Sequence, residues 1–535
     1  MNKKTFFLLL LACLFSFFLN FYGKSGKLCL NADEAAVGYN AYSIAQTGKD
    51  EYGAFLPLRL KSFGDYKMPL YSYFSIPFTR ALGLNETSTR ALNDLLAVLF
   101  PAAVFFLVRE LFDNDHIALL SSFLAATSLG LHLVGRQAHE SYLAAFIITS
   151  SSIWIIKALK RPTPLSILLL SVLSFLALFT YQSSRIFILL FIVLGIIYLY
   201  LPRKKIQIQK KARFAVLSLV AVFILFSLTD LVYKPERVKN LLFFNNIGFS
   251  LKINQFRAEG GNRLIYNKLT TGFKDLTSEY SKYFSPQFLM INGDENPRFG
   301  LAGMGIITPV EYLFLFIGLY FLFRYKQRWR LFLLALLFAS PLSASLTWAG
   351  LSISRSLFFL IPILVISSYG IIKLLGFQTK NQRVLLIVLV SLELFSLVYS
   401  WDLYLNHYPK RPTTIRALEC GYKELTDYVK TNYNRFDKFY ITKKNGQPYI
   451  FLLFYLKYPP GAYQQQARLS AADQYGFGQV ERFDKFDFNF KYDSSLKKSV
   501  FIGYPDDFNN LKVNTGRIKK IAIRGEEIFW IWENP

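Results

Sequence analysis

Two adjacent carboxylates stand just beyond the first apolar segment of this 535-residue chain. The stretch LNADEAAVGYNAYSIAQTG begins at Leu30, and its Asp33 and Glu34 occupy the expected first turn of a helix, with Asn31 as a candidate cap. Neighbouring residues on a helix point about 100° apart, so the two carboxylates cannot face one target squarely. One of them could transfer a proton while the other orients it or holds a cation. The plainer alternative is that Asp33 only caps the helix or meets its dipole.

Cationic side chains recur on the side of the membrane where the topology derived below places this acid pair. Lys67 follows in the same loop, two residues after Asp65, and Arg136, Arg185 and Arg355 stand in short connections between apolar runs. A guanidinium binds phosphate through two parallel hydrogen bonds, so these arginines and Lys67 are candidate ligands of a phosphate at headgroup depth. The alternatives are snorkelling toward water and structural pairing with a nearby acid.

Other polar residues give weaker signals. The stretch NGDENPRFG supplies Asp294, Glu295 and Arg298 as candidate ligands of a substrate or a metal. Glu393 is the one carboxylate near the middle of an apolar run, which makes it a functional candidate, although a buried hydrogen-bonding role is equally open. His139 has no second histidine nearby, so a structural role is favoured over metal binding.

The composition indicates a polytopic membrane protein. Hydrophobic residues make up 53% of the chain and charged residues 18%, against about 25% charged in soluble domains, and the mean hydropathy is +0.29. The net charge of +26 fits Lys and Arg collected in cytoplasmic loops, and no basic, aromatic-interleaved module points to nucleic acid. The three cysteines lack zinc or redox spacing, but Cys29 and Cys420 could pair outside the cytoplasm.

Eleven apolar runs have roughly the length that crosses a bilayer core of about 30 Å. They lie near residues 5–22, 91–108, 117–134, 141–157, 164–182, 184–201, 213–232, 309–324, 330–347, 356–375 and 383–401. With the N-terminus inside, the densely basic loops from Pro202 and from Lys373 fall on the cytoplasmic side, as the positive-inside rule requires. The first run is expected to be an uncleaved anchor, because no small-residue cleavage site follows it.

The outer side then receives a first loop (23–90), a middle loop (233–308) and the C-terminal segment. DKFYIT and SVFIGY have strand patterns, and the residues around Gly525 have that of a hairpin. PYIFLLFYLKY is too short to span the membrane and predicts a buried helix. We therefore expect a membrane domain over residues 1–402 and an extracytoplasmic α/β domain over residues 411–535.

This arrangement resembles the GT-C superfamily of polyprenyl-phosphate-sugar-dependent glycosyltransferases. Within it, the chain is most similar to the branch of protein O-mannosyltransferases and lipid A aminoarabinose transferases, over about residues 1–400. The stretches that carry the resemblance are NADEAAVGYNAYSI, GDYKMPLY, GDENPRFG followed by PVEYLFLFIGLY, and PLSASLTW followed by SRSLFFLIP.

The resemblance implies transfer of a sugar from a polyprenyl-phosphate donor to a hydroxyl of a protein, lipid or glycan, on the non-cytoplasmic face and with inversion. It implies Asp33 as general base, Glu34 as the second, orienting or metal-associated acid, and Lys67 as a ligand of the donor phosphate. In the aminoarabinose branch a metal-binding acid directly precedes that lysine. Here Tyr66 precedes Lys67 and the acid is Asp65, one position further back, so a divalent metal remains an open expectation.

Two other classes of function compete with this reading. A transporter or flippase would have charged residues or broken helices at mid-membrane and inverted repeats, whereas the sequence shows one mid-span acid and no repeat. A non-catalytic envelope assembly protein would present the C-terminal domain, but it would have no need of Lys67 and the outer arginines.

Overall fold

The computed structural model describes residues 1–24, 26–63, 65–200, 206–233, 242–348, 350–376, 382–471, 479–493, 495–509 and 515–535. The chain divides into two compact units, each made of two separate stretches of sequence. Unit 1 comprises residues 1–22 and 93–404, and unit 2 comprises residues 23–92 and 405–535. The first long loop thus shares a unit with the C-terminal segment, whereas the boundary expected from the sequence grouped it with the membrane domain.

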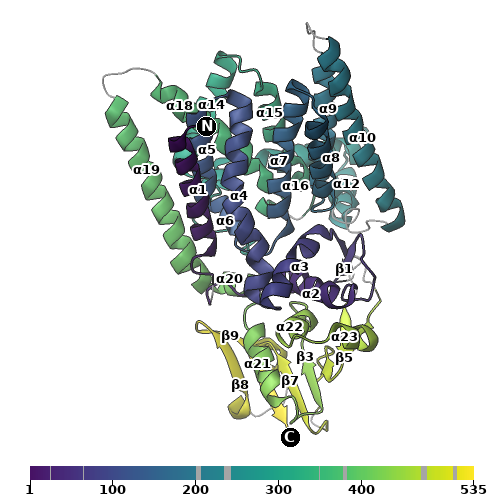
Figure 1. Ribbon diagram of the computed structural model, residues 1–535. Helices are drawn as coiled ribbons and strands as arrows, with labels where there is room; N and C mark the ends of the chain where they lie inside the picture. Colours follow the sequence, from purple (N-terminus) through teal and green to yellow (C-terminus); the bar gives the residue numbers. More distant parts are fainter. Residues whose placement is uncertain are drawn as a thin grey trace. The chain divides into compact units, whose positions relative to one another are not determined.

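Unit 1 is a bundle of apolar helices that run side by side (Figure 1). These are α1 (Lys3–Phe21), α4 (Glu86–Phe112, which begins in unit 2), α5 (Asp115–Thr127), α6 (Leu129–Gly135), α7 (Glu140–Lys160), α8 (Pro164–Leu178), α9 (Ser184–Tyr200), α10 (Ile206–Tyr233), α14 (Pro309–Arg324), α15 (Arg330–Ala339), α16 (Leu342–Ser345), α17 (Ile353–Ser356), α18 (Leu360–Leu375) and α19 (Gln382–Asp402). Large apolar side chains such as Phe7, Leu225 and Phe395 are exposed on them, as expected of helices whose solvent is lipid. The chain is a multi-pass membrane protein.

The count of eleven spans is not confirmed, although a helix lies in each of the eleven ranges. Among the described residues, six helices are long and apolar enough to cross a membrane, or up to seven if α5 and α6, bent by 51°, form one span. The others are shorter: α14, for example, fills its apolar run at 309–324 but has only 16 residues. The run at 330–347 is interrupted after Ala339, just before Pro341, which cannot donate the next helical hydrogen bond. Parts of the basic loops after Pro202 and Lys373 lie outside the described residues.

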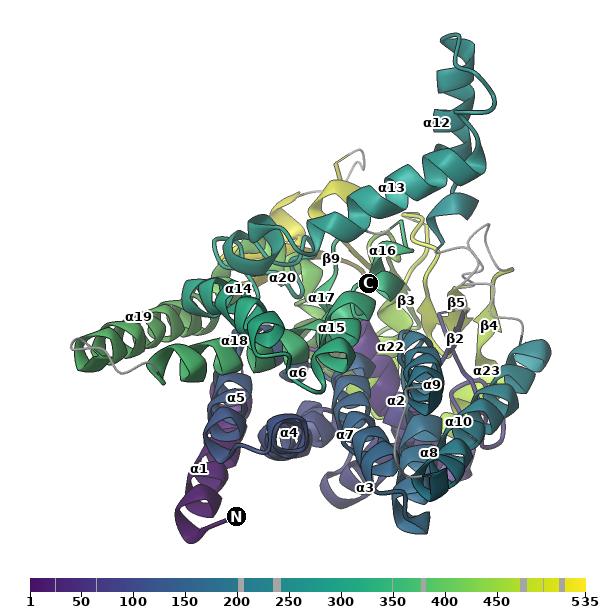
Figure 2. The same cartoon turned by 90° about the horizontal axis from the view of Figure 1, so that it is seen from above.

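The described part of the segment between α10 and α14, residues 242–308, carries four further helical elements. They are η1 (Phe243–Asn245), α12 (Ile247–Ala258), α13 (Lys268–Lys282) and the π-helical turn η2 (Gln287–Ile291). Asn246 caps α12 and Asn267 caps α13, each through its side-chain oxygen. Figure 2 shows α13 lengthwise in a view that looks along α4 and α9, so α13 runs across the direction of the bundle.

Unit 2 begins with the first loop of the sequence. This loop contributes α2 (Ala32–Thr47), the antiparallel hairpin of β1 (Leu60–Ser62) and β2 (Asp65–Lys67), and α3 (Leu70–Leu82). The described residues of the C-terminal segment form a seven-stranded sheet in the order β4-β5-β6-β3-β7-β9-β8. Its strands are β3 (Lys438–Ile441), β4 (Arg468–Leu469), β5 (Val480–Phe483), β6 (Phe486–Asp487), β7 (Ser499–Gly503), β8 (Lys519–Ile523) and β9 (Glu526–Asn534).

Three helices accompany the sheet, α21 (Tyr422–Asn432), α22 (Pro448–Tyr455) and α23 (Pro460–Gln466), after the short α20 (Pro412–Ala417). The ring of Tyr422 on α21 stacks on Phe451 of α22 at 4.1 Å and meets Phe529 of β9. Two expectations from the sequence are confirmed here. The apolar stretch at 448–458 contains a buried helix, α22, and the residues around Gly525 form the hairpin of β8 and β9.

The two stretches of unit 2 are joined covalently. Cys29 and Cys420, which the sequence left as a candidate pair, form a disulfide across a separation of 391 residues. The Arg524 guanidinium donates to the Lys27 carbonyl at 2.8 Å, and the Tyr39 hydroxyl donates to the Tyr458 carbonyl at 2.9 Å. Residues 23–92 therefore depend on the C-terminal segment for their structure.

Candidate functional site

The N-terminus of α2 divides the two adjacent acids between two environments. The Asn31 side chain accepts from the Glu34 amide at 3.1 Å, and Glu34 Oε2 accepts from the Asn31 amide at 3.3 Å, which is a reciprocal capping box. Glu34 is 1% exposed, and Arg90 donates to it at two points, Nε to Oε1 at 2.6 Å and Nη2 to Oε2 at 2.8 Å. Both oxygens of this carboxylate are therefore engaged within the fold.

Asp33, its neighbour, lies on the accessible side of the same turn. Its side chain is 41% exposed, and Lys67 Nζ lies 2.5 Å from its Oδ1. The β1–β2 hairpin sets this contact, since Lys67 pairs with Leu60 at the open end of the hairpin, and its ammonium also lies 4.8 Å from the centre of the Phe63 ring. The accessible carboxylate can accept a proton. The ammonium beside it has three donors, so it can bind an anion at the same place.

Asp65, the other acid expected near Lys67, begins β2 and pairs with Ser62 through the backbone. Its side chain lies outside the description of the structure.

The three arginines expected at a phosphate lie in unit 1, each in a different setting. Arg136 is buried beyond the end of α6, where its guanidinium donates to the Leu19 carbonyl and lies over the Tyr404 ring. Arg185 at the start of α9 pairs with Asp230 of α10 through two contacts, at 2.9 and 3.2 Å. That pairing is the structural alternative that the sequence left open for these residues.

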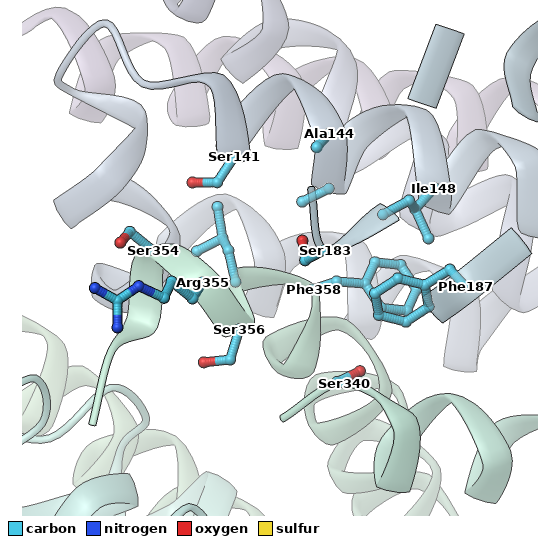
Figure 3. A pocket seen from close by; sticks show the side chains of 12 residues that line it. Ser141, Ala144, Ile148, Ser183, Phe187, Ser340, Ser354, Arg355, Ser356 and Phe358 are labelled. Carbon is cyan, nitrogen blue, oxygen red and sulfur yellow. The ribbon is translucent and has the colours of Figure 1, made fainter. Parts of the chain in front are cut away.

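Arg355, on α17, has a neutral hydrogen-bond partner, and the Asp294 carboxyl is close enough to feel its charge. Its Nη1 donates to the Thr347 hydroxyl at 2.9 Å. It lines a small cavity of about 10 Å³ among hydroxyl groups and aromatic rings, and Figure 3 shows its guanidinium pointing away from Phe187 and Phe358. The serines in that lining are Ser141, Ser183, Ser340, Ser354 and Ser356. The cavity has room for about one water molecule, so a larger anion would have to meet Arg355 outside it.

The three candidate residues of the middle loop also have different environments. Asp294 is buried and accepts from the backbone amides of Asn296 at 2.8 Å and Ile353 at 2.6 Å, which ties the loop to the start of α17. Burial raises the pKa of Asp294 to about 6, against the lowering effect of those hydrogen bonds. Glu295 is exposed, while the Arg298 backbone carbonyl accepts from Gln137 at 2.9 Å.

Glu393 and His139 both have structural partners in unit 1. Glu393 accepts from the hydroxyl of Thr308, the N-cap of α14, at 2.8 Å. His139 caps α7 by accepting from the Ser141 amide at 3.2 Å.

Two further polar residues of unit 2, Arg90 and Glu51, were not identified as candidates from the sequence. Arg90 stands one residue before an expected span, and a charge at the start of an apolar run is a signal for a buried partner. Glu51 has no such signal, because the surrounding KDEYG is typical of a solvated turn. In the structure Glu51 is fully buried, with Oε1 3.3 Å from the Tyr449 hydroxyl and Oε2 without a partner among the described residues. Burial, followed by the charge of Asp50, raises the pKa of Glu51 to about 8.

The described side chains do not form a metal centre. Asp33 and Glu34 each have a cationic partner, Lys67 and Arg90, which supplies the charge that a bound cation would supply. No cluster of three His, Cys, Asp or Glu side chains occurs within the described ranges.

Solved structures show which fold this is. The sequence matches no protein-family profile and no curated protein. ArnT from Cupriavidus metallidurans is similar in its undecaprenyl-phosphate-bound structure (TM-score 0.53, 10% identity) and in its apo structure (TM-score 0.53, 11% identity). Each match covers 99% of this chain and 98% of ArnT.

The Archaeoglobus fulgidus oligosaccharyltransferase in its apo form is similar at a TM-score of 0.50 and 12% identity, over 85% of this chain. This chain spans 64% of the length of that protein. At such low identity the likeness concerns the fold, and it extends over nearly the whole chain. The resemblance inferred from the sequence is confirmed at that level: this chain has the fold of the GT-C glycosyltransferases.

Proposed function

We propose that this protein is a membrane glycosyltransferase that moves a sugar from a polyprenyl-phosphate donor to an acceptor hydroxyl, with inversion. The observation that carries the proposal is the contact of Lys67 Nζ with the accessible Asp33 carboxylate at 2.5 Å. The fold supports it, since ArnT, similar over 99% of this chain, was solved with undecaprenyl phosphate bound. Fold alone does not define a reaction, so the argument rests on the pair.

In this mechanism Asp33 accepts the proton of the acceptor hydroxyl as its oxygen attacks the anomeric carbon. The bond from that carbon to the phosphate oxygen breaks, and negative charge grows on the phosphate. Lys67 stabilises this charge, and because an ammonium has three donors it can hold Asp33 and a phosphate oxygen together. One hydrogen bond from the ammonium to the Asp33 carboxylate and one to the phosphate oxygen place these two acceptors roughly 5 Å apart. The anomeric carbon then lies between the base and the leaving group.

Glu34 is proposed as a positioning residue. Both of its oxygens accept hydrogen bonds from Arg90 or Asn31, so its contribution is to fix the first turn of α2 and thereby the direction of Asp33. Among the three arginines proposed as ligands of the donor phosphate, Arg355 is the strongest candidate. Its partner is the neutral hydroxyl of Thr347, whereas Arg185 already pairs with Asp230.

We further propose that unit 2 lies outside the cytoplasm. The Cys29–Cys420 disulfide supports this placement, because such bonds persist in oxidising compartments. The positive charges of Lys3 and Lys4, at the start of α1, then lie on the cytoplasmic side.

The test is a transfer assay with the purified full-length protein in proteoliposomes. A panel of polyprenyl-phosphate sugars, labelled in the sugar, is supplied with an envelope extract that contains acceptors. The wild-type protein should release polyprenyl phosphate from at least one donor and label an acceptor, and Asp33→Asn should lose this activity. Lys61→Ala, which removes another lysine of the same hairpin, is the matched control and should retain it.

The competing transporter is distinguished in the same assay. The bend between α5 and α6 is a feature that transporters also have. A donor that crosses the bilayer with its sugar–phosphate bond intact, or full activity of the Asp33→Asn protein, would contradict the proposal.

A further inference from the structure

One face of α13 is apolar, and its N-terminal half is exposed. Leu269, Phe273, Leu276 and Tyr280 recur at i, i+4, i+7 and i+11, which places them on a single line along the helix. Leu269 is 82% exposed and Phe273 is 72% exposed, while Leu276 and Tyr280 are half-buried. We call these four residues the α13 stripe. The turn before α13 adds Leu264 and Ile265, which are also exposed.

The α13 stripe continues the surface that faces lipid on the bundle. At its inner end the Tyr280 hydroxyl donates to the carbonyl of Phe338 at 2.7 Å, and the Phe284 ring lies 5.6 Å from the Phe338 ring. Phe338 is the penultimate residue of the apolar helix α15 and is itself 51% exposed. The stripe therefore starts next to the C-terminal end of α15, at the level along the bundle where the apolar surface of α15 ends.

The direction of α13 suits a membrane surface. Helices α4 and α9 are seen end-on in Figure 2, whereas α13 is seen lengthwise and carries α12 at its far end. A helix that runs across the bundle at the end of α15 lies in the plane of the membrane surface.

The opposite face of α13 is polar and has its own place in the fold. Asp275, Ser278, Glu279 and Lys282 line a cleft of about 510 Å³ between α12 and α13. Within it Lys252 of α12 pairs with Asp275 at 2.8 Å. The polar face is therefore occupied by contacts with α12, while the stripe is apolar. One polar and one apolar face are what a helix at a membrane interface requires.

Exposed basic residues accompany the stripe. Arg263, Lys268 and Lys274 are all exposed along α13 and the turn that precedes it. Lys268 and Lys274 are sequence neighbours of Leu269 and Phe273, so they point about 100° away from them. Their long side chains can reach back to the phosphates of anionic lipids, which attract basic residues close to the membrane surface.

We propose that the α13 stripe docks into the lipid leaflet next to it, with Leu269 and Phe273 at the boundary of headgroups and acyl chains. Lys268 and Lys274 then lie among anionic headgroups. This inference does not rest on the proposed catalytic activity. It assigns the middle loop a second attachment to the membrane, beyond the spans.

The test uses single-cysteine variants of the full-length protein, labelled with the environment-sensitive fluorophore NBD. In a Cys13→Ser background, with the Cys29–Cys420 disulfide retained, the probe is placed by Phe273→Cys or Leu269→Cys. Ser278→Cys is the matched control, because Ser278 is exposed on the same helix but lies on its polar face, opposite the stripe. The proteins are reconstituted alone in phosphatidylcholine vesicles, with and without phosphatidylglycerol.

We expect blue-shifted emission from the two stripe probes, quenching by lipids with a shallow doxyl group and protection from aqueous iodide. The Ser278 probe should be open to iodide. Phosphatidylglycerol should strengthen lipid quenching at the stripe, and Lys268→Gln with Lys274→Gln should remove that increase. Stripe probes that iodide quenches as strongly as the control would overturn the proposal, because the stripe would then lie in water. Protection from both quenchers would also overturn it, because the occupant would be a second copy of the chain. Equal thermal unfolding of labelled and unlabelled proteins confirms that labelling leaves the fold intact.

Discussion

Glu34 and Arg90 form a buried two-point ion pair, Nε to Oε1 at 2.6 Å and Nη2 to Oε2 at 2.8 Å, with side chains 1% and 4% exposed. Asp33, one residue earlier, is 41% exposed and meets Lys67 instead. Two carboxylates that are indistinguishable in the sequence thus have different physical situations. Removing the Glu34 carboxylate leaves the buried Arg90 charge unpaired, whereas removing the Asp33 carboxylate alters an accessible contact with Lys67.

For Glu34→Gln we therefore expect a large loss of stability. Breaking a buried ion pair by removing one partner costs about 3–5 kcal/mol, since the Arg90 guanidinium is left without its counter-charge. Thermal unfolding in detergent, followed by the fluorescence of the tryptophans, would measure it. Glu34→Gln combined with Arg90→Met should recover part of the loss. If the single variant unfolds at the wild-type temperature, the pair has no structural importance.

For Asp33→Asn the expectation is reversed. Stability should change by less than about 1 kcal/mol, the size of an exposed helix-dipole effect. Turnover should fall by about 10²–10⁴-fold, the usual contribution of a general base. Single-turnover kinetics with saturating donor would separate chemistry from binding. A wild-type rate would remove Asp33 from the mechanism and make Asp65 the next candidate.

For Lys67→Ala we expect weaker donor binding as well as slower transfer. A hydrogen bond to a charged group contributes about 1.5–3 kcal/mol, which corresponds to at least about a tenfold loss of affinity. Equilibrium binding of a labelled polyprenyl phosphate would measure it, with Lys61→Ala as the control. Equal affinities of the two variants would mean that Lys67 does not contact the phosphate.

Glu51 should make stability depend on pH. Its folded pKa of about 8 lies above its ordinary value, so the folded protein holds a proton that the unfolded chain releases at lower pH. The stabilisation is complete below about pH 4.5 and is lost as the pH rises toward 8. Glu51→Gln should unfold with the wild type at pH 5 and at a higher temperature than the wild type at pH 9. A constant difference between the two proteins across this range would contradict the shifted pKa.

The disulfide should hold unit 2 together. Replacing Cys29 and Cys420 with serine should cost about 2–5 kcal/mol, as the loss of a native disulfide usually does. Limited proteolysis of the intact protein should then cut residues 23–92 and 405–535 faster, with residues 93–404 unchanged as an internal reference. Equal cleavage of the two proteins would show that the non-covalent contacts suffice.

Local patterns predicted local structure well. The start of α2 follows from Asn31 and Glu34, whose spacing defines a capping box, and the β8–β9 hairpin follows from Gly525 and its flanking strand patterns. The eleven spans were not confirmed, because composition locates an apolar run but not the residue where its helix ends. Partners distant in sequence could not be predicted. Arg90 lies 56 residues from Glu34 and Tyr449 lies 398 residues from Glu51, and no periodicity links them.

The discontinuous make-up of unit 2 has a consequence for biosynthesis. Residues 23–92 leave the ribosome first, but their partners in residues 405–535 follow only after residues 93–404 have been made. At about 5–20 residues per second this delay lasts roughly 15–60 s. Throughout that interval the Cys29 thiol has no Cys420 to pair with, and Glu51 has no Tyr449 to cover it. The first loop therefore lacks these stabilising contacts until the last quarter of the chain has been made.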